Sequence, residues 1–502
     1  MKLPKQYMFE GFFTVTKAPE FPDGFEWINT DEPLSFDRLK GNVVVLDFWT
    51  YCCINCMHTL PTLAELEKKY KDRQVVFIGV HSGKFFAEQD ADNVRNAVLR
   101  YNISHPVVVD RKMQIWQSFG INAWPTIVII DPCGTVVYKQ AGEGRKEEIS
   151  DVVDVLLEKH SRKGTLAREL PTIHSSKKIP SALLSFPGKL AISDVGKIAI
   201  SDSNHNRILI SDLSGKIEHV IGSGHEGLMD GSFDLCKFFR PQGLAWNDKI
   251  LFVADTENHA IRKIDFETRT VLTVAGTGVQ GPWISSGGDG TSTALSSPWD
   301  VACKDDIVYV AMAGNHQIWT YDIQTKMVLP FAGTGQENII DGPARAAQLA
   351  QPSGVFVHGD KLYFADSEVS AIRQIDLCTK TVKTLVGHGL FEFGHRDGHM
   401  DDALFQHPLG LCVFGETIFV ADTYNSAIRT IDLKNNQVLT LVGKTEKNLL
   451  CLPDNPECSI LPLYEPSDVK YYEDKLYITD TNNHLIRVFD LRTNSLNILN
   501  LK

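Results

Sequence analysis

The chain has 502 residues, of which 43% are hydrophobic and 22% are charged. This composition is that of an ordinary globular protein, and the length allows two or three domains. No apolar run approaches the roughly 18 residues of a membrane-spanning helix, so we expect no membrane partner. The net charge is −12, and residues 181–502 carry all of it, with 27 Lys and Arg against 39 Asp and Glu. This acidic surplus disfavours a nucleic-acid partner.

The cysteines and the first residues indicate the compartment. The ten cysteines are mostly single and irregularly spaced, unlike the framework of a disulfide-stabilised secreted protein. Residues 1–10 contain no apolar segment like that of a signal peptide. We therefore expect a cytoplasmic protein with free thiols, in which Cys451 and Cys458 pair only under oxidising conditions.

The most informative motif is the Cys-x-x-Cys formed by Cys53 and Cys56, at a turn from an apolar strand to a helix. The strand is expected at residues 43–48 and the helix at residues 57–69. A helix N-terminus presents unpaired N–H groups, which stabilise the thiolate of Cys53. Cys56 lies one turn further along, within reach of a mixed disulfide formed by Cys53. The motif indicates thiol–disulfide chemistry, with Cys53 as the attacking thiolate and Cys56 as the resolving thiol.

An acidic residue, Asp47, lies inside the apolar strand, six residues before Cys53. We expect a carboxyl group at this position to be buried, and burial raises the pKa of a carboxyl group. Such a group can exchange a proton with the nearby thiols, so we assign Asp47 a catalytic role. The alternative is a buried acid that only makes hydrogen bonds.

A proline directly before a strand adds to this pattern. Trp124 and Pro125 precede the apolar run 127–130, and Pro125 resembles the cis-proline that faces the disulfide in thioredoxins. Pro61, five residues after Cys56, resembles the proline that bends the active-site helix of the same family. The resemblance implies a thioredoxin-like fold with Pro125 in the active site.

The motif departs from that family at three positions. Cys52 takes the place of the tryptophan that thioredoxins have before the motif, and Ile54 and Asn55 replace their Gly-Pro pair. Residues between the cysteines tune the reduction potential. We regard Ile54, Asn55 and Trp124 as candidates for contact with substrate. Cys52 is expected to be a buried thiol rather than a third redox partner.

Strand-like and helix-like segments alternate over residues 26–160, as in an α/β domain. An additional helix and strand between residues 80 and 124 resemble the insertion of bacterial thioredoxin-like reductases. Residues 1–25 form an N-terminal extension. Residues 161–180 lose the periodicity, and we expect them to form a linker.

Residues 181–502 repeat one pattern six times. A hairpin motif recurs around residues 202, 255, 312, 366, 422 and 480, at spacings of 53 to 58 residues. Each period holds four short apolar strands, and six such periods predict a six-bladed β-propeller. In the hairpin, an acid such as Asp255 can accept N–H groups of the turn. The hairpins of the form Asp-Thr-x-Asn-His resemble the NHL-repeat signature.

The two parts together resemble the NHL repeat-containing protein 2 family, over roughly residues 20–502. The resemblance implies a multidomain protein, with an α/β thioredoxin-like domain followed by an all-β six-bladed NHL propeller. Larger members of that family carry a further β-rich C-terminal domain. The chain ends at Lys502, just after the expected outer strand of the last blade, so we expect that domain to be missing here.

Three functions remain open at this point. The leading hypothesis is a thiol–disulfide oxidoreductase whose propeller recruits a protein or peptide client. The second is a non-catalytic interaction scaffold with a vestigial thioredoxin-like domain. The third is a propeller enzyme that uses a metal in the central channel, held by recurring histidines; these are His205, His259, His316 and His484.

Simpler interpretations are preferred for the recurring residues. We expect the histidines to be turn residues of the repeat, and we expect no cofactor and no metal site. No second Cys-x-x-Cys or nearby Cys/His pair completes four metal ligands around the thiols. Recurring arginines are expected to pair with neighbouring aspartates rather than to bind RNA; these are Arg262, Arg373, Arg429 and Arg487.

Overall fold

The computed structural model describes residues 16–169, 182–445, 448–449 and 462–502. The chain divides into two compact units, Met1–Ile179 and Pro180–Lys502, and each is described by itself. The helix α5 (Lys146–Lys163) continues three residues into the predicted linker. Cys451 and Cys458, most of that linker and most of the predicted N-terminal extension lie outside the described residues. Among the helices of the described segments, none is both long enough and apolar enough to cross a membrane.

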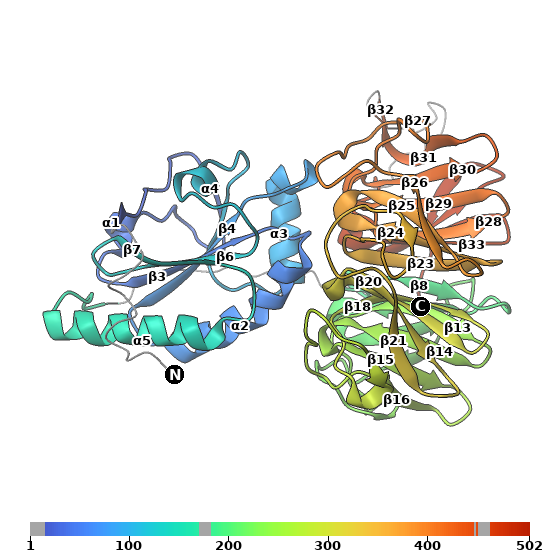
Figure 1. The fold of residues 1–502 in the computed structure, drawn as a ribbon, viewed down its shortest axis with the longest axis horizontal. Helices are drawn as coiled ribbons and strands as arrows, with labels where there is room; N and C mark the ends of the chain where they lie inside the picture. The colour runs from blue at the N-terminus through green and yellow to red at the C-terminus, as the bar shows by residue number, and fades with distance from the viewer. Residues whose placement is uncertain (1–15, 170–181, 446–447, 450–461) are drawn as a thin grey trace. The chain divides into compact units, whose positions relative to one another are not determined.

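The first unit is a seven-stranded mixed sheet with helices on both faces (Figure 1). In sheet order the strands are β1 (Thr16–Lys17), β7 (Thr135–Ala141), β6 (Thr126–Ile130), β3 (Val43–Trp49), β4 (Val75–His81), β5 (Val107–Val109) and β2 (Glu26–Ile28). The helices before α5 are α1 (Phe36–Leu39), α2 (Ile54–Tyr70), the 3₁₀ turn η1 (Ala87–Gln89), α3 (Ala91–Arg100) and α4 (Gln114–Ser118). Strand β3 is central, parallel to β4 and antiparallel to β6.

Strand β3 is buried at every position and separates two hydrophobic cores. On one face, Val45 packs with Leu63 of α2 and with α5. On the other face, Leu46 packs with Ile115 of α4. Figure 1 shows α2 and α5 on the same side of the sheet. Because side chains alternate along a strand, Asp47 follows Val45 onto the face that α2 covers.

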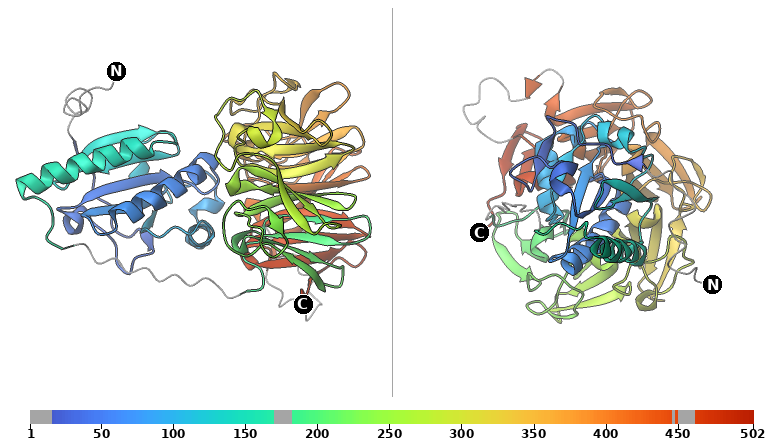
Figure 2. Two further views of the ribbon diagram at one scale, coloured as in Figure 1. Left: turned by 90° about the horizontal axis from the view of Figure 1, so that it is seen from below. Right: turned by 90° about the vertical axis from the view of Figure 1, so that its left-hand side faces the viewer.

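The second unit is a β-propeller of six sheets, as predicted (Figure 2). Blade one has β8 (Leu190–Ile192), β9 (Ile198–Asp202), β10 (Arg207–Ser211) and β11 (Ile217–Ile221). Blade two has β12 (Gly231–Ser232), β13 (Pro241–Asn247), β14 (Ile250–Asp255), β15 (Ala260–Asp265) and β16 (Thr270–Ala275). Blade three has β17 (Gly288–Asp289), β18 (Pro298–Lys304), β19 (Ile307–Met312), β20 (Gln317–Asp322) and β21 (Met327–Ala332).

The chain continues through three further blades. Blade four has β22 (Gly342–Pro343), β23 (Pro352–His358), β24 (Lys361–Asp366), β25 (Ala371–Asp376) and β26 (Thr381–Val386). Blade five has β27 (Gly398–His399), β28 (Gly410–Phe414), β29 (Thr417–Asp422), β30 (Ala427–Asp432), β31 (Gln437–Thr445) and β32 (Asn448–Leu449). Blade six has β33 (Pro466–Tyr472), β34 (Lys475–Asp480), β35 (Leu485–Asp490) and β36 (Ser495–Ile498).

The innermost strands β8, β13, β18, β23, β28 and β33 contact one another in turn around the axis, and β33 returns to β8. Blades two to five each carry a two-residue strand beyond the predicted four, paired with the fourth long strand of the blade. A pairing of two residues leaves no periodic hydrophobic signal, so the sequence pattern did not predict these strands.

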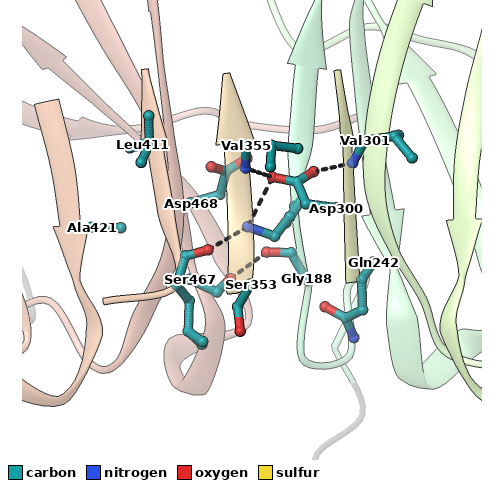
Figure 3. Close-up of polar contacts among 12 residues, drawn as sticks. Gly188, Gln242, Asp300, Val301, Ser353, Val355, Leu411, Ala421, Ser467 and Asp468 are labelled. Atoms are coloured by element: carbon teal, nitrogen blue, oxygen red, sulfur yellow. Dashed lines mark hydrogen bonds and ion pairs between the residues drawn. The ribbon is translucent and has the colours of Figure 1, made fainter. Parts of the chain in front are cut away.

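Charged side chains meet among the innermost strands of the propeller (Figure 3). Lys189 is buried, and its Nζ lies 3.3 Å from Asp300 Oδ2 and donates to the carbonyl of Leu409 at 2.5 Å. Asp300 also accepts the backbone N–H groups of Val301 and Val355, at 2.9 and 3.0 Å. The innermost strands of four blades are therefore joined through one lysine–aspartate pair.

Candidate active site

Cys53 is the N-cap residue of α2, and Cys56 lies in the first turn of that helix. Both are free thiols. Cys53 is partly exposed, whereas Cys56 is buried. Burial raises the pKa of the Cys56 thiol well above its usual range, and its hydrogen bond with Cys53 and the charges of Cys53 and Asp47 raise that pKa further. The two thiols therefore differ in the way that an attacking and a resolving thiol require.

Asp47 lies beneath the motif on β3 and is 2% exposed. Neither carboxyl oxygen has a hydrogen-bond partner among the described residues. Burial raises the pKa of Asp47 to about 7, and the charge of His105 opposes this rise. Asp47 and Cys56 interact electrostatically. A carboxyl group that titrates near neutral pH beside a buried thiol can accept the proton of that thiol.

Pro125 is placed beside the motif by the sheet. The Trp124–Pro125 peptide bond is cis, as the resemblance implied. Strand β6 starts at Thr126, which pairs with Phe48 near the end of β3, so Pro125 lies at the edge from which the motif emerges. The indole N–H of Trp124 donates to the carbonyl of Ser82 at 3.0 Å.

The other two substrate-facing candidates, Ile54 and Asn55, form the first turn of α2. The side-chain oxygen of Asn55 is buried without a hydrogen-bond partner among the described residues, and its backbone carbonyl accepts from Thr59 at 3.0 Å. Contact of these residues with substrate stays a prediction.

A buried glutamate, which no sequence motif indicated, holds the loop before the motif. One carboxyl oxygen of Glu88 accepts from Thr50 Oγ1 at 2.6 Å and from the N–H of Cys52 at 2.9 Å. The other accepts the N–H groups of Lys84 and Phe85, at 2.9 and 3.0 Å. Glu88 thus ties the loop to the insertion after β4. Its separation of 35 residues from Cys53 leaves no local sequence signal.

The recurring histidines of the propeller are structural, but one of the four was misaligned. His259 has a left-handed backbone with φ of 48°, and its Nδ1 accepts the N–H of Ser297 in the next blade at 3.0 Å. His205 lies one position earlier in its repeat, and its Nδ1 lies 2.8 Å from Asp202. The inter-blade pairs are Asn206–Arg240, His259–Ser297, His316–Gln351, Ser370–His407, Ser426–Glu465 and His484–Phe186.

In the three histidine pairs Nδ1 accepts an N–H, so the neutral ring carries its hydrogen on Nε2 and has no free lone pair for a metal. His484 closes the ring of pairs onto blade one. Within the part of the chain that the structure describes, no group of three or more His, Cys, Asp or Glu side chains could hold a metal ion. The geometry therefore gives no support to a channel metal.

The recurring arginines pair with aspartates, as predicted. Arg429 is fully buried and donates to Asp422 at 2.8 Å and to Asp397 at 2.6 Å. The corresponding pairs are Arg262 with Asp255 and Asp230, Arg373 with Asp366 and Asp341, and Arg487 with Asp480. The prediction that Asp255 caps its own turn was wrong, because its Oδ1 accepts the N–H of Phe239, 16 residues earlier.

Comparisons with known proteins agree with both halves of this architecture. A family model described as thioredoxin-like matches residues 41–136. NHL repeat-containing protein 2 of Homo sapiens is 39% identical over 527 residues, which cover 98% of this chain and 72% of the human protein. The chain belongs to the NHL repeat-containing protein 2 family.

Two other relatives extend this comparison. Protein SUPPRESSOR OF QUENCHING 1, chloroplastic, of Arabidopsis thaliana is 46% identical over 500 residues, which cover 95% of this chain. This chain spans 47% of that plant protein. Thiol-disulfide oxidoreductase ResA of Bacillus thuringiensis is 28% identical over 148 residues, 29% of this chain and 83% of the bacterial protein. The family thus combines a thioredoxin-like domain with an NHL propeller in one chain.

Proposed function

We propose that this protein is a thiol–disulfide oxidoreductase that acts through Cys53 and Cys56. The observation that carries the proposal is the buried carboxyl group of Asp47, which has a pKa of about 7. This carboxyl group interacts electrostatically with the buried thiol of Cys56. A scaffold would gain nothing from a buried acid without a hydrogen-bond partner, because such a group destabilises the fold at neutral pH. We also propose that the protein acts in a reducing compartment such as the cytosol, which suits the free thiols of the pair.

The reaction takes two exchange steps. The Cys53 thiolate attacks one sulfur of a client disulfide, so the client disulfide breaks and a mixed disulfide forms. Cys56 then loses its proton to Asp47 and attacks the sulfur of Cys53, which releases the second client sulfur as a thiolate. The two client thiolates take protons from water. Two electrons pass to the client, and the protein is left with a Cys53–Cys56 disulfide. A dithiol reductant reverses that oxidation by the same exchange chemistry.

The propeller is proposed to recruit a protein or peptide client. Its net charge is −12, and the four recurring arginines are fully buried, so they add no positive charge to its surface. A nucleic-acid partner would require exposed, clustered Lys and Arg. The surface charge therefore favours a protein partner with basic character.

A trapping experiment tests the proposal. In Cys56→Ser the second step is blocked, so a mixed disulfide between Cys53 and a disulfide-bonded probe such as insulin is expected to accumulate. Cys53→Ser is expected to form none, because Cys56 is buried and stays protonated. Non-reducing gels and intact-protein mass spectrometry measure the adduct.

Cys133→Ser is the matched control, since Cys133 is an exposed thiol of the same unit and plays no part in the reaction. It is expected to behave as the wild type. Equal trapping by the Cys53→Ser and Cys56→Ser variants, or trapping by neither, would refute the assigned roles.

A further inference from the structure

The proton that Asp47 accepts must leave a closed site. Asp47 is buried, and its carboxyl group has no hydrogen-bond partner among the described residues, so it has no direct contact with solvent through which to exchange. A group that gains and loses a proton once per turnover needs an exit to water. That exit must run through side chains near Asp47 that can themselves carry a proton.

Gly79 lies between Asp47 and such a group. It is the register partner of Asp47 in the parallel pair of β3 and β4, so both residues direct their β-positions to the face that α2 covers. A β-carbon on Gly79 would lie 3.2 Å from His105 Nε2 and 2.9 Å from Trp49 Nε1. The missing side chain at Gly79 therefore lets His105 approach β4 next to Asp47.

His105 is oriented for proton transfer by Glu67. Its Nδ1 lies 2.7 Å from Glu67 Oε1, and Glu67 lies one turn after Leu63 on the face of α2 that covers the sheet. A ring nitrogen that faces a carboxylate carries the hydrogen, which leaves Nε2 as the acceptor. His105 Nε2 is buried and has no partner among the described residues. His105 Nε2 and both carboxyl oxygens of Asp47 thus lack a partner among the described residues, and a water between them would carry the proton from one to the other.

Glu67 connects this arrangement to the surface. Its side chain is 20% exposed, whereas that of His105 is 5% exposed. Its second oxygen accepts from Ser104 Oγ at 2.7 Å, which fixes the carboxylate beside His105. Protons that reach Glu67 can therefore pass to water.

We propose that His105 and Glu67 form a proton relay that connects Asp47 to solvent. The inference rests on the proposed function, because it supplies the exit for the proton of the resolving step. Each transfer moves one proton and no electrons, from the Cys56 thiol to Asp47, from Asp47 through a bridging water to His105 Nε2, and from His105 Nδ1 to Glu67. Water then takes the proton from Glu67. His105 and Glu67 act through Asp47, so they are positioning residues for its proton and do not touch the client.

Another titratable group on this face of the sheet is His81, two residues after Gly79 on β4. Burial lowers the pKa of His81 to about 3, so it stays neutral at physiological pH. It stacks on Tyr51, with ring centroids 5.4 Å apart. His81 therefore takes no part in the relay.

Two measurements on the full chain test the relay. The first follows the carboxyl carbon of Asp47 by NMR as the pH changes, in the wild type and in His105→Gln. Glutamine keeps a donor for Glu67 but carries no charge, so the pKa of Asp47 is expected to rise in this variant. An unchanged titration of Asp47 would show that His105 is not coupled to it and would overturn the proposal.

The second measurement is the rate at which a mixed disulfide on Cys53 is resolved. His105→Gln and Glu67→Gln are each expected to slow this step on the order of tenfold at pH 7, since each removes one proton carrier. In a background of Asp47→Asn the same substitutions should have no further effect, because the relay acts only through Asp47. If His105→Gln or Glu67→Gln slows the step further in the Asp47→Asn background, the proposal is overturned.

His160→Gln is the matched control. His160 is another buried histidine of the same unit, and its Nδ1 lies 2.8 Å from Thr165 Oγ1. Its loss should lower stability without changing the titration of Asp47 or the rate of resolution. If the wild type resolves no mixed disulfide, the proposed function fails, and the NMR titration still decides whether His105 is coupled to Asp47.

Discussion

Replacement of Asp47 by asparagine is expected to stabilise the thioredoxin-like unit at neutral pH while it slows the resolving step by a factor of about 10² to 10⁴. The stabilisation follows from the raised pKa of Asp47, about 7 in the folded chain. In an unfolded chain an aspartate has a pKa of roughly 3.9, and a difference of one in pKa between the two states corresponds to about 1.36 kcal/mol. The difference of about three for Asp47 therefore amounts to about 4 kcal/mol.

The sign of the effect follows from proton binding. Between about pH 4 and pH 7 the folded state keeps its proton on Asp47 while the unfolded state has lost it. The wild type therefore loses stability as the pH rises through this range, and Asp47→Asn does not. Hydrogen exchange of the β3 amides at pH 4 and pH 8 measures the difference. The comparison of two pH values cancels any pH-independent effect of the asparagine. An equal change with pH in both proteins would contradict the account.

Replacement of Arg429 by alanine is expected to destabilise the propeller by about 3 to 5 kcal/mol. The guanidinium group is fully buried, and its removal leaves Asp422 buried without its cation. Burial already raises the pKa of Asp422 to about 6, and Arg429 opposes that rise. The carbonyl groups of Leu404 and Arg396 also each lose one of their two donors. Urea unfolding of the wild type and the variant measures the loss.

Arg492→Ala is the matched control, because Arg492 pairs with Asp474 at the surface, with side chains 78% and 41% exposed. An exposed pair contributes roughly 0 to 1 kcal/mol. A loss of stability of less than about 1 kcal/mol for Arg429→Ala would show that the buried pair does not hold the blade together.

Arg373 and Arg429 are both buried, so substitutions of either residue report on folding. They are therefore unsuitable as tests of binding at the surface.

The sequence was sufficient where a local pattern carries the signal. The apolar run of β3 predicted a buried strand, and the motif after it predicted a helix at residues 57–69, which in the structure begins three residues earlier, at Ile54. Pro125 was recognised by its position before β6, and its peptide bond is cis. The six periods predicted the six blades because the hairpin recurs in every period. Five of the six hairpins have an Asp at the same position, where the third has Met312.

Residues that depend on packing between distant segments were missed. Glu88 reaches the motif from the insertion after β4, and His105 packs against Gly79, the strand partner of Asp47, only because Gly79 lacks a side chain. Asp255 makes its bond to a residue of the preceding loop, although its place in a turn suggested a local cap. In each case the partner is fixed by the tertiary fold, and no spacing in the sequence reports it.

The histidine error has a related cause. His205 and His259 were aligned by residue type, but the repeat position is defined by a left-handed backbone, which Asn206 occupies in blade one. That position requires an acceptor for the next blade, and Asn, His and Ser all provide one. The spacing from the aligned aspartates would have corrected the alignment, because Asn206 and His259 lie four residues after Asp202 and Asp255.

A redox titration of the wild-type chain against glutathione buffers, with the thiols counted by mass spectrometry, tests the central claim most directly. The account predicts that Cys53 and Cys56 lose two hydrogens together, in one two-electron transition between roughly −270 and −120 mV, the range of protein oxidoreductases. Thiols that stay reduced throughout the series, or a potential below about −300 mV as in structural disulfides, would contradict it.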